Sequence, residues 1–443
     1  MLSERMMVKS NIYKKRRSLI FKSFEDHATA ILVSATEQFR SNDVPYPYRQ
    51  NNNLYYVTGF DQPNAILLVH KTDKNKLIEH FFIKKPNAYD EVWTGKLPSK
   101  QYVKKTYDFT KVDYVDEFQK YLTEYLAQSN VVYHSLDKDS DSIESFEKSI
   151  EMIKKKYRSG VVAPTKNICL DSIIQDHRLI KDKHEITAIK KSATASSKVH
   201  LSLMRKYSLF KSEKDIQFYL SHQFNLHGGV EAYPSIVASG KNACILHYTK
   251  NNSKLNTRDL LLVDAACEID NYASDITRTI PLSGKFSQPQ KDIYNIVLEA
   301  QLKAIKKCIP GNTLADVHNE AVKWITKGLI KINLIQANLK DAISNDLYKK
   351  FYMHGTGHWL GMDVHDPCRY KDGTKLVKLS PGMIFTVEPG IYIRPVKDVP
   401  IEYHNIGIRI EDDVLITKKG FEVLTSSTPK TIKEIETTMA SVK

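Results

Sequence analysis

Acidic side chains follow apolar, strand-like stretches in the C-terminal half of the chain. In LLLVDAACEIDNYASDITRTIPL, Asp264 ends one such stretch and Asp275 begins another, with Asp270-Asn271 between them. This dipeptide is a typical turn, so the run predicts a hairpin in which Asp264 pairs opposite Thr277. The two aspartates then become diagonal neighbours, about 7 Å apart at the backbone. Carboxylates that close repel each other unless a cation lies between them, although either aspartate alone is more often a turn former.

Two glutamates add to this acidic set. In PGMIFTVEPGIYI, Glu388 ends an apolar strand directly before a Pro-Gly turn, where core packing explains a carboxylate poorly. In IGIRIEDDVLIT, strand alternation places Arg409 and Glu411 on the same face. We interpret Glu388 as a ligand and expect Arg409 and Glu411 to share its site. A structural pair at the surface is the alternative for these two.

Histidines near the glutamates supply a second kind of ligand. His354, His358 and His365 lie in FYMHGTGHWLGMDVHD. The spacing of the first two is that of the helical HExxH zinc motif, but the glycines between them disfavour a helix and no glutamate follows His354. We therefore expect a loop or strand that closely approaches a metal or substrate. His247 ends the apolar stretch ACILHYTK, where a lone histidine is more often a core residue.

These residue types together predict a metal site. Four carboxylates and one imidazole in one pocket carry a formal charge of about minus four, which two divalent ions balance. Paired metals roughly 3.5 to 4 Å apart, bridged by carboxylates and a hydroxide, hydrolyse amides. Ligation by many oxygens and a single histidine favours Mn²⁺, with Co²⁺ or Zn²⁺ able to substitute.

The rest of the chain must fold into elements that hold these ligands. A length of 443 residues predicts two domains. Short apolar runs (AILV, NAILLVH, HFFIKK, VVYH) alternate with polar segments from about residue 28 to 135, which is typical of an α/β domain. The pattern breaks near Ala163, so we expect an N-terminal domain over residues 1–175 and a catalytic domain over 176–443.

The second domain is predicted to begin with a helix. Ile186, Ile189 and Ala193 fall at helical spacing behind the acidic residues Asp182 and Glu185. From the domain boundary onward, this helix included, the sequence predicts two or three amphipathic helices mixed with strands. Every residue named above as a candidate ligand lies in this half.

Composition narrows the class of protein. No window reaches about eighteen uninterrupted apolar residues and the N-terminus lacks the pattern of a secretory signal, so we expect a cytoplasmic enzyme without membrane association. The net charge of +14 comes from lysines scattered through the whole chain, which argues against a nucleic-acid surface. The basic run Lys14–Arg17 is expected to be the solvated face of an opening helix. Five widely spaced cysteines without a CxxC pair predict reduced thiols.

The ordered motifs resemble the pita-bread metallopeptidases of family M24, which include methionine aminopeptidase, prolidase and aminopeptidase P. The family's order of five metal ligands is matched by Asp264, Asp275, His358, Glu388 and Glu411. HGTGHWLGMDVHD, TVEPGIYI and GIRIEDDV are similar to the catalytic signatures of aminopeptidase P, and YPYRQNNNLYYVTGFDQPNAILL is similar to its N-terminal domain. The resemblance implies an α/β N-terminal domain like that of creatinase and prolidase, followed by an α+β catalytic domain with the pita-bread fold.

The resemblance also implies roles for individual residues. Asp275 and Glu411 would bridge two metals, Asp264 would complete one metal, and His358 with Glu388 would complete the other. Glu388 would also accept a proton from the nucleophile. The remaining roles concern substrate: His247 and His365 would hydrogen-bond its carbonyl and the tetrahedral intermediate, and the proline side would be lined by His354, Tyr392 and Arg409. Asp43 and Trp93 match residues that reach a neighbouring subunit's active site, which implies a homotetramer or a dimer.

The activity implied is hydrolysis of the first peptide bond in peptides with proline at the second position. A hydroxide that bridges two metals would attack the carbonyl. Prolidase activity on Xaa-Pro dipeptides is the alternative among enzymes, and a metal-free binding protein on the same fold is the alternative outside them. The full ligand set counts against the latter. Thr356-Gly357 stands where some relatives carry leucine and serine, but neither position is a ligand.

Overall fold

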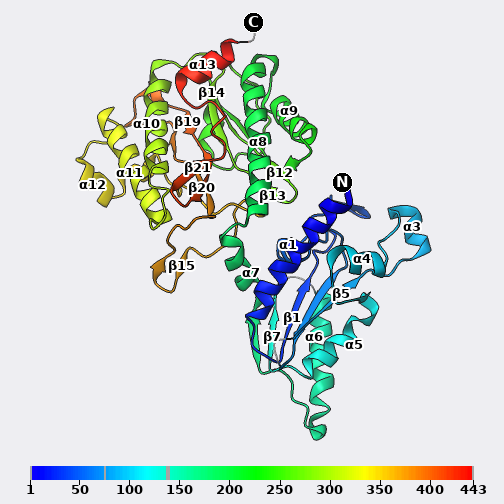
Figure 1. Ribbon diagram of the computed structural model, residues 1–443. Helices are drawn as coiled ribbons and strands as arrows, with labels where there is room; N and C mark the ends of the chain where they lie inside the picture. The colour runs from blue at the N-terminus through cyan, green and yellow to red at the C-terminus, as the bar shows by residue number, and fades with distance from the viewer. Residues whose placement is uncertain (1, 74–75, 136–139, 442–443) are drawn as a thin grey trace. The chain divides into compact units, whose positions relative to one another are not determined.

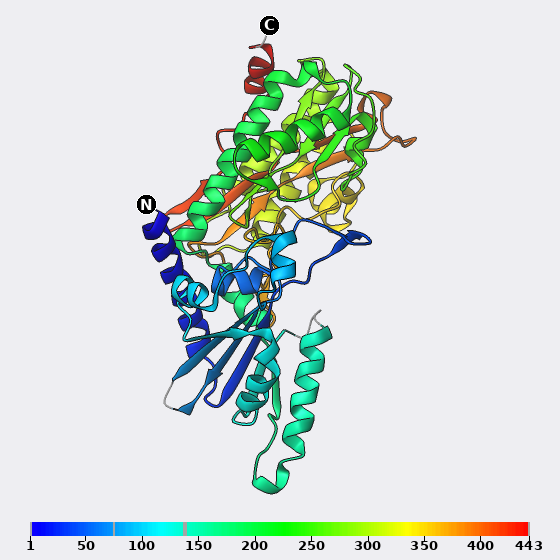
Figure 2. The same cartoon turned by 90° about the vertical axis from the view of Figure 1, so that its right-hand side faces the viewer.

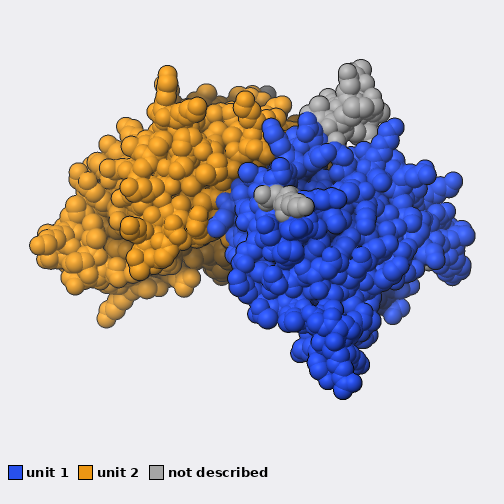
Figure 3. Space-filling model, turned by 60° about the horizontal axis from the view of Figure 1, so that its bottom comes forward, with its two compact units in different colours: residues 1–177 blue, residues 178–443 orange. Residues whose placement is uncertain are grey.

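The computed structural model describes residues 2–73, 76–135 and 140–441. The chain divides into two compact units, residues 1–177 and residues 178–443, which are coloured separately in Figure 3.

Unit 1 is built on a six-stranded mixed sheet (Figures 1 and 2). The apolar runs of the sequence form its central strands, as predicted. β1 pairs with β4 antiparallel and with β7 parallel. The order across the sheet is β6 (Lys111–Tyr114), β5 (Leu77–Ile83), β4 (Ile66–Lys71), β1 (Ala28–Val33), β7 (Val131–His134) and β8 (Lys166–Cys169).

Helices cover both faces of this sheet because its strands are apolar on both sides. Phe81 and Phe82 of β5 point to opposite faces: Phe81 contacts Phe60 and Phe109, and Phe82 contacts Phe118 of α5. The helices are α1 (Leu2–Lys22), α2 (Asn52–Thr58), α3 (Ala88–Thr94), α4 (Lys100–Tyr107), α5 (Phe118–Leu126) and α6 (Ser140–Lys154). A small hairpin, β2 (Phe39–Ser41) with β3 (Val44–Pro45), precedes α2. Helix α7 (Leu170–Leu179) contains the boundary between the units.

The basic run in α1 is only in part the solvated face that the sequence suggested: Lys14 and Lys15 are exposed, but the two arginines are not. Arg17 is fully buried and Arg16 nearly so. The Arg17 guanidinium donates hydrogen bonds to Glu79 and to the backbone carbonyls of Val57, Tyr107 and Asp108. Burial lowers the pKa of Arg17, but Glu79 and four hydrogen bonds compensate for the lost water. For the arginines the expectation was wrong because these acceptors come from segments 40 or more residues away.

Unit 2 contains more helices than the two or three expected. Those in its described residues are α8 (Lys183–Lys206), α9 (Glu213–Leu226), α10 (Gln288–Ile305), α11 (Leu314–Lys331), α12 (Leu339–Ser344) and α13 (Ile432–Ala440). Helix α8 begins where the sequence predicted. Asp182 caps it, and Glu185 closes the capping box by accepting from the Asp182 backbone N–H.

Short antiparallel sheets lie between the helix pairs α8–α9 and α10–α11 (Figure 1). One sheet has the order β10-β11-β14, another β17-β20-β21, and β18 pairs with β19. A shared apolar core includes Val199 of α8, Phe224 of α9, Val297 of α10 and Ile325 of α11. The strands are β10 (Ile236–Ser239), β11 (Leu260–Asp264), β14 (Thr277–Pro281), β17 (Ile384–Val387), β18 (Gly390–Ile393), β19 (Ile406–Arg409), β20 (Asp412–Thr417) and β21 (Gly420–Val423). Smaller strands are β9 (Val230–Glu231), β12 (Cys267–Ile269), β13 (Tyr272–Ala273), β15 (Lys371–Asp372) and β16 (Lys375–Leu376).

Two general features bear on the sequence analysis. None of the described helices is both long and apolar enough to cross a membrane. The five cysteines all lie in the described residues and form no disulfide, and only Cys169 among them is exposed.

Candidate metal centre

The hairpin that carries the two aspartates has the predicted register. Strands β11 and β14 pair with Asp264 opposite Thr277. Asp270 and Asn271 form the turn, with φ values of 54° and 64°. Positive φ at both central positions matches the right-handed twist of the flanking strands, which fixes the register of the hairpin. A single-residue slip would place the two carboxylates on opposite faces.

The two glutamates reach the hairpin from neighbouring strands. Glu388 directly follows β17, and Glu411 lies between β19 and β20. The Thr277 hydroxyl donates to Glu411 Oε2 at 2.6 Å, and the Glu411 backbone N–H donates to the Thr277 carbonyl at 3.2 Å. Arg409 and Glu411 are 4% and 2% exposed, so the alternative of a surface pair is wrong.

The histidine segment is irregular backbone, as the glycines predicted. It runs beside β17: Trp359 bridges to Phe385, and the Thr386 backbone N–H donates to the His358 carbonyl at 3.0 Å. A side chain at Gly357 would place its Cβ 1.8 Å from the Thr386 carbonyl oxygen. At position 357 the close approach that requires glycine is therefore to β17, and Gly355 and Gly357 both line the pocket described next. This contact brings His358 next to Glu388.

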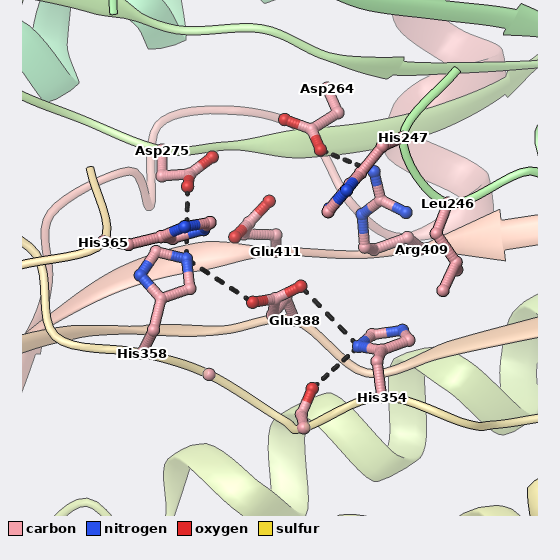
Figure 4. Close-up of a pocket in the computed structure, with 12 residues that line it drawn as sticks. Leu246, His247, Asp264, Asp275, His354, His358, His365, Glu388, Arg409 and Glu411 are labelled. Carbon is pink, nitrogen blue, oxygen red and sulfur yellow. Dashed lines mark hydrogen bonds and ion pairs between the residues drawn. The ribbon is translucent and has the colours of Figure 1, made fainter. Parts of the chain in front are cut away.

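A pocket of about 260 Å³ collects these side chains (Figure 4). Asp275, His358 and Glu411 each offer a ligand atom within 4.8 Å of the others. His358 Nε2 lies 3.4 Å from Asp275 Oδ2 and 3.6 Å from Glu388 Oε1. The full lining is Leu246, His247, Asp264, Asp275, His354, Gly355, Gly357, His358, His365, Glu388, Arg409 and Glu411.

The charges in this pocket perturb one another. Burial raises the pKa of Glu388 to about 7, although His358 and Arg409 oppose the shift. Burial and the neighbouring Asp275 and Glu388 raise the pKa of Glu411 well above its usual value. Burial lowers the pKa of His358, but the hydrogen bond to Asp275 and the charge of Glu388 outweigh it and raise that pKa to about 9. The pocket thus holds more negative charge than its own groups can neutralise, and it attracts cations.

Comparison with known proteins shows which protein family this chain resembles. Residues 187–418 match the model of metallopeptidase family M24, and residues 13–133 match that of the aminopeptidase P N-terminal domain. The Xaa-Pro aminopeptidase of Escherichia coli K12 is 35% identical over 432 residues, which cover 97% of this chain and 98% of that protein. The structure of Pseudomonas aeruginosa aminopeptidase PepP aligns with a TM-score of 0.93 at 37% identity over 98% of both chains. A zinc-substituted E. coli aminopeptidase P in complex with product aligns at 0.94 and 34% identity, over 98% of this chain and 99% of that one.

The chain belongs to metallopeptidase family M24. Both matched domains and the full-length relatives make it an enzyme of the aminopeptidase P type, with the predicted fold of an α/β N-terminal domain and a pita-bread catalytic domain. Enzymes of a metallopeptidase family act through divalent ions. The donor set of this M24 enzyme fits such ions, because four carboxylates, two buried and two partly buried, face one pocket in which Arg409 is the neighbouring buried cation.

A tyrosine that the sequence analysis missed lies among the carboxylates of this M24 site. The Tyr233 hydroxyl is 2.6 Å from Asp264 Oδ1 and 2.5 Å from Asp275 Oδ1. Arg409 Nη2 contacts the other oxygen of Asp264 at 2.5 Å. Tyr233 lies in the loop before β10, more than thirty residues from Asp264, so no local spacing in the sequence pointed to it.

The remaining predicted site residues fall into three groups. His247, His354, His365 and Arg409 line the pocket, so His247 is not the core residue that a lone histidine suggested. Tyr392 is buried and is not among the lining residues; its hydroxyl contacts His354 Nε2 at 2.9 Å and accepts from Arg409 at 3.0 Å. Tyr392 therefore supports the lining residues from behind, and its place on the proline side stays a prediction. Asp43 and Trp93 belong to unit 1 and are exposed.

Proposed function

We propose that the chain removes the first residue from tripeptides and longer peptides that carry proline in second position. The observation that carries the proposal is the convergence of five metal-ligand side chains on one pocket rimmed by three histidines. Relatives that match nearly the whole chain bear the name Xaa-Pro aminopeptidase, which supports the same activity.

The metal ligands would be Asp264, Asp275, His358, Glu388 and Glu411, with Asp275 and Glu411 shared between two ions. Oxygen-rich ligation with one histidine favours manganese. When bound, the two ions would supply an activated water at neutral pH and balance negative charge in the transition state.

Protons and hydrogen bonds would come from the chain itself. Glu388 lies at the end of β17, is held by the Thr386 hydroxyl at 3.3 Å, and would accept a proton from the attacking water. His365 and His247 would donate hydrogen bonds to the substrate carbonyl. Burial, and then the charge of His358, lower the pKa of His365, so this imidazole would act as a neutral donor.

The proline side would be formed by His354, Leu246 and the stem of Arg409. Proline gives a tertiary amide without an N–H, so its pocket needs apolar walls and no acceptor for a missing hydrogen. Tyr392 holds both His354 and Arg409 through its hydroxyl, and this would keep the wall rigid.

A homo-oligomer, a tetramer or a dimer, would complete the site. Trp93 is 74% exposed on α3 and contacts Tyr89, which is 71% exposed. Asp43 is exposed in the hairpin between β2 and β3. We propose that these two residues reach the pocket of a neighbouring copy. Manganese as the native ion, the oligomer and the cytoplasmic location stay predictions.

Hydrolysis of matched peptides with added Mn²⁺ tests the function. We expect a higher kcat/KM for Xaa-Pro-Xaa than for Xaa-Pro, because an aminopeptidase leaves the groove open beyond proline. A strong preference for the dipeptide would instead indicate a prolidase. Efficient cleavage of Xaa-Ala-Xaa would contradict the proline pocket.

A further inference from the structure

A buried carboxylate outside the metal centre collects five hydrogen bonds from neutral donors. Glu213 is the first residue of α9 and is fully buried. Its Oε1 accepts from the Ser239 backbone N–H, the Ser239 hydroxyl and Asn242 Nδ2, at 2.8 to 2.9 Å. Its Oε2 accepts from the Tyr248 hydroxyl at 2.8 Å and the Ser253 backbone N–H at 2.9 Å. One carboxylate thus ties together both ends of the segment 239–253.

This segment carries two side chains of the pocket. Leu246 and His247 line it, on the side opposite His358 in Figure 4. The next residue, Tyr248, is 6% exposed and points the other way, toward Glu213. The hydrogen bond between Tyr248 and Glu213 therefore holds the backbone that carries His247 in place. Asn251 adds a second attachment, since its side chain bonds the Val237 N–H and the Ser235 carbonyl.

The geometry points to Glu213 as a positioning residue that holds His247 and Leu246 in the pocket wall. The inference rests on the proposed function, because it concerns the side of the pocket where the substrate carbonyl would bind. A carboxylate suits the task since both of its oxygens accept, with about four lone-pair directions in all. All five of its donors are uncharged. The directions of the hydrogen bonds therefore set the orientation of the carboxylate, without a competing attraction to a positive charge.

Glutamine at position 213 can keep the hydrogen bonds of Oε1 but not all of those of Oε2. An amide oxygen placed at the Oε1 position keeps the donors from Ser239 and Asn242. The amide NH₂ then faces the Tyr248 hydroxyl, which can turn to accept, and the Ser253 N–H, which cannot. The loss therefore falls on residues 248–253, directly after His247, while the volume of the side chain is preserved.

A double-mutant cycle tests the inference. Glu213→Gln should lower kcat/KM on Xaa-Pro-Xaa on the order of 10- to 100-fold, because small misplacements of a positioning group have such effects. In a background that already carries Leu246→Ala and His247→Ala, the same change should cost less than about threefold. The matched control is Glu185→Gln, a buried glutamate at the start of α8 whose capping role an amide can fill. It should change kcat/KM less than about threefold.

Two results would overturn the inference: a decrease in kcat/KM for Glu213→Gln in the alanine background as large as in the wild-type background, or an equally large decrease for Glu185→Gln. Tyr248→Phe removes a single donor and keeps the ring, so the same cycle with this variant decides the matter if Glu213→Gln does not fold. Amide hydrogen exchange of the metal-free protein gives a reading independent of activity. Exchange should rise within residues 240–253 in Glu213→Gln and stay unchanged in Glu185→Gln; unchanged exchange in both would refute the role. A wild-type protein inactive on Xaa-Pro-Xaa would refute the proposed function, and the exchange comparison would still decide whether Glu213 holds the segment.

Discussion

Asp366 follows His365 directly and provides a test of how the histidine segment is held. Its side chain is 1% exposed and accepts from Arg178 Nη2 at 2.5 Å and Lys181 Nζ at 2.8 Å, both of which are also buried. The same Arg178 nitrogen contacts Asp363, which is 39% exposed, at 2.5 Å. Two aspartates thus share one guanidinium in different surroundings. We expect Asp366→Asn to lower the free energy of unfolding of unit 2 by about 3 to 5 kcal/mol. Asp363→Asn should lower it by less than about 1 kcal/mol.

The difference arises from what each substitution leaves behind. Without the Asp366 charge, Lys181 stays buried beside an amide, and an unpaired buried cation is costly. Burial raises the pKa of Asp366, but Lys181 and Arg178 outweigh it and hold that pKa below its usual value. A depressed folded pKa adds stability above the unfolded pKa of about 3.9, and this stability is lost as pH falls through the folded value. The effect of Asp366→Asn should therefore be constant from about pH 5 to 8 and shrink only below about pH 4.

Urea unfolding followed by tryptophan fluorescence measures both variants. In a Trp93→Phe background the remaining tryptophans, Trp324 and Trp359, lie in unit 2 and report on it alone. Trp359 is a close probe, because its carbonyl accepts from the Asp366 backbone N–H at 2.9 Å. Equal costs for the two substitutions would refute the argument, as would an effect of Asp366→Asn that grows toward low pH.

Three further outcomes are expected from the metal centre. Glu388→Gln and Asp264→Asn should each lower kcat by several orders of magnitude with an unchanged circular dichroism spectrum, and near wild-type turnover of Glu388→Gln would contradict its role as proton acceptor. Tyr233→Phe should weaken Mn²⁺ binding about 10- to 100-fold in calorimetric titration, because its hydroxyl orients two of the carboxylates that we propose as ligands; an unchanged Kd would show that the contact is dispensable. Chelation should abolish activity reversibly and lower the melting temperature of unit 2, since an ion at about 100 times its Kd stabilises by about 2.7 kcal/mol. Turnover that persists with metal content measured as zero would refute the metal mechanism.

The parts of the site that the sequence could predict are those fixed by local backbone chemistry. The turn at Asp270 and Asn271 sets the register that aligns Asp264 with Thr277, and only residues inside one hairpin are involved. Glu388 at a strand end before Pro-Gly is equally local. In unit 1 the apolar runs form β1, β4, β5 and β7. They could be predicted because the pattern of a strand depends only on consecutive residues.

The parts that could not be predicted depend on contacts between distant segments. Arg17 is buried because four acceptors from residues 57 to 108 meet its guanidinium, and a run of basic residues carries no sign of that. Tyr233 reaches the carboxylates from a loop, and Glu213 at the start of α9 meets its five donors in the distant segment 239–253, so no local spacing pointed to either residue. The helices α9 to α13 were undercounted because several are short or weakly amphipathic, and their capping residues are a better signal than their apolar faces.

The protonation of the histidines follows from how each is held. Burial, and then Arg409, lower the pKa of His354 to about 4, and the pKa of His365 is lowered as well. Both therefore stay neutral at physiological pH, and a neutral imidazole can donate a hydrogen bond without opposing cations in the same pocket. His358 alone among these three has a raised pKa, and it is the one that faces Asp275 and Glu388 at 3.4 and 3.6 Å. A proton held there occupies the position that a metal would take, so metal binding must release it. Which of these three histidines suits the proposed role of metal ligand is thus set by which of them the carboxylates face.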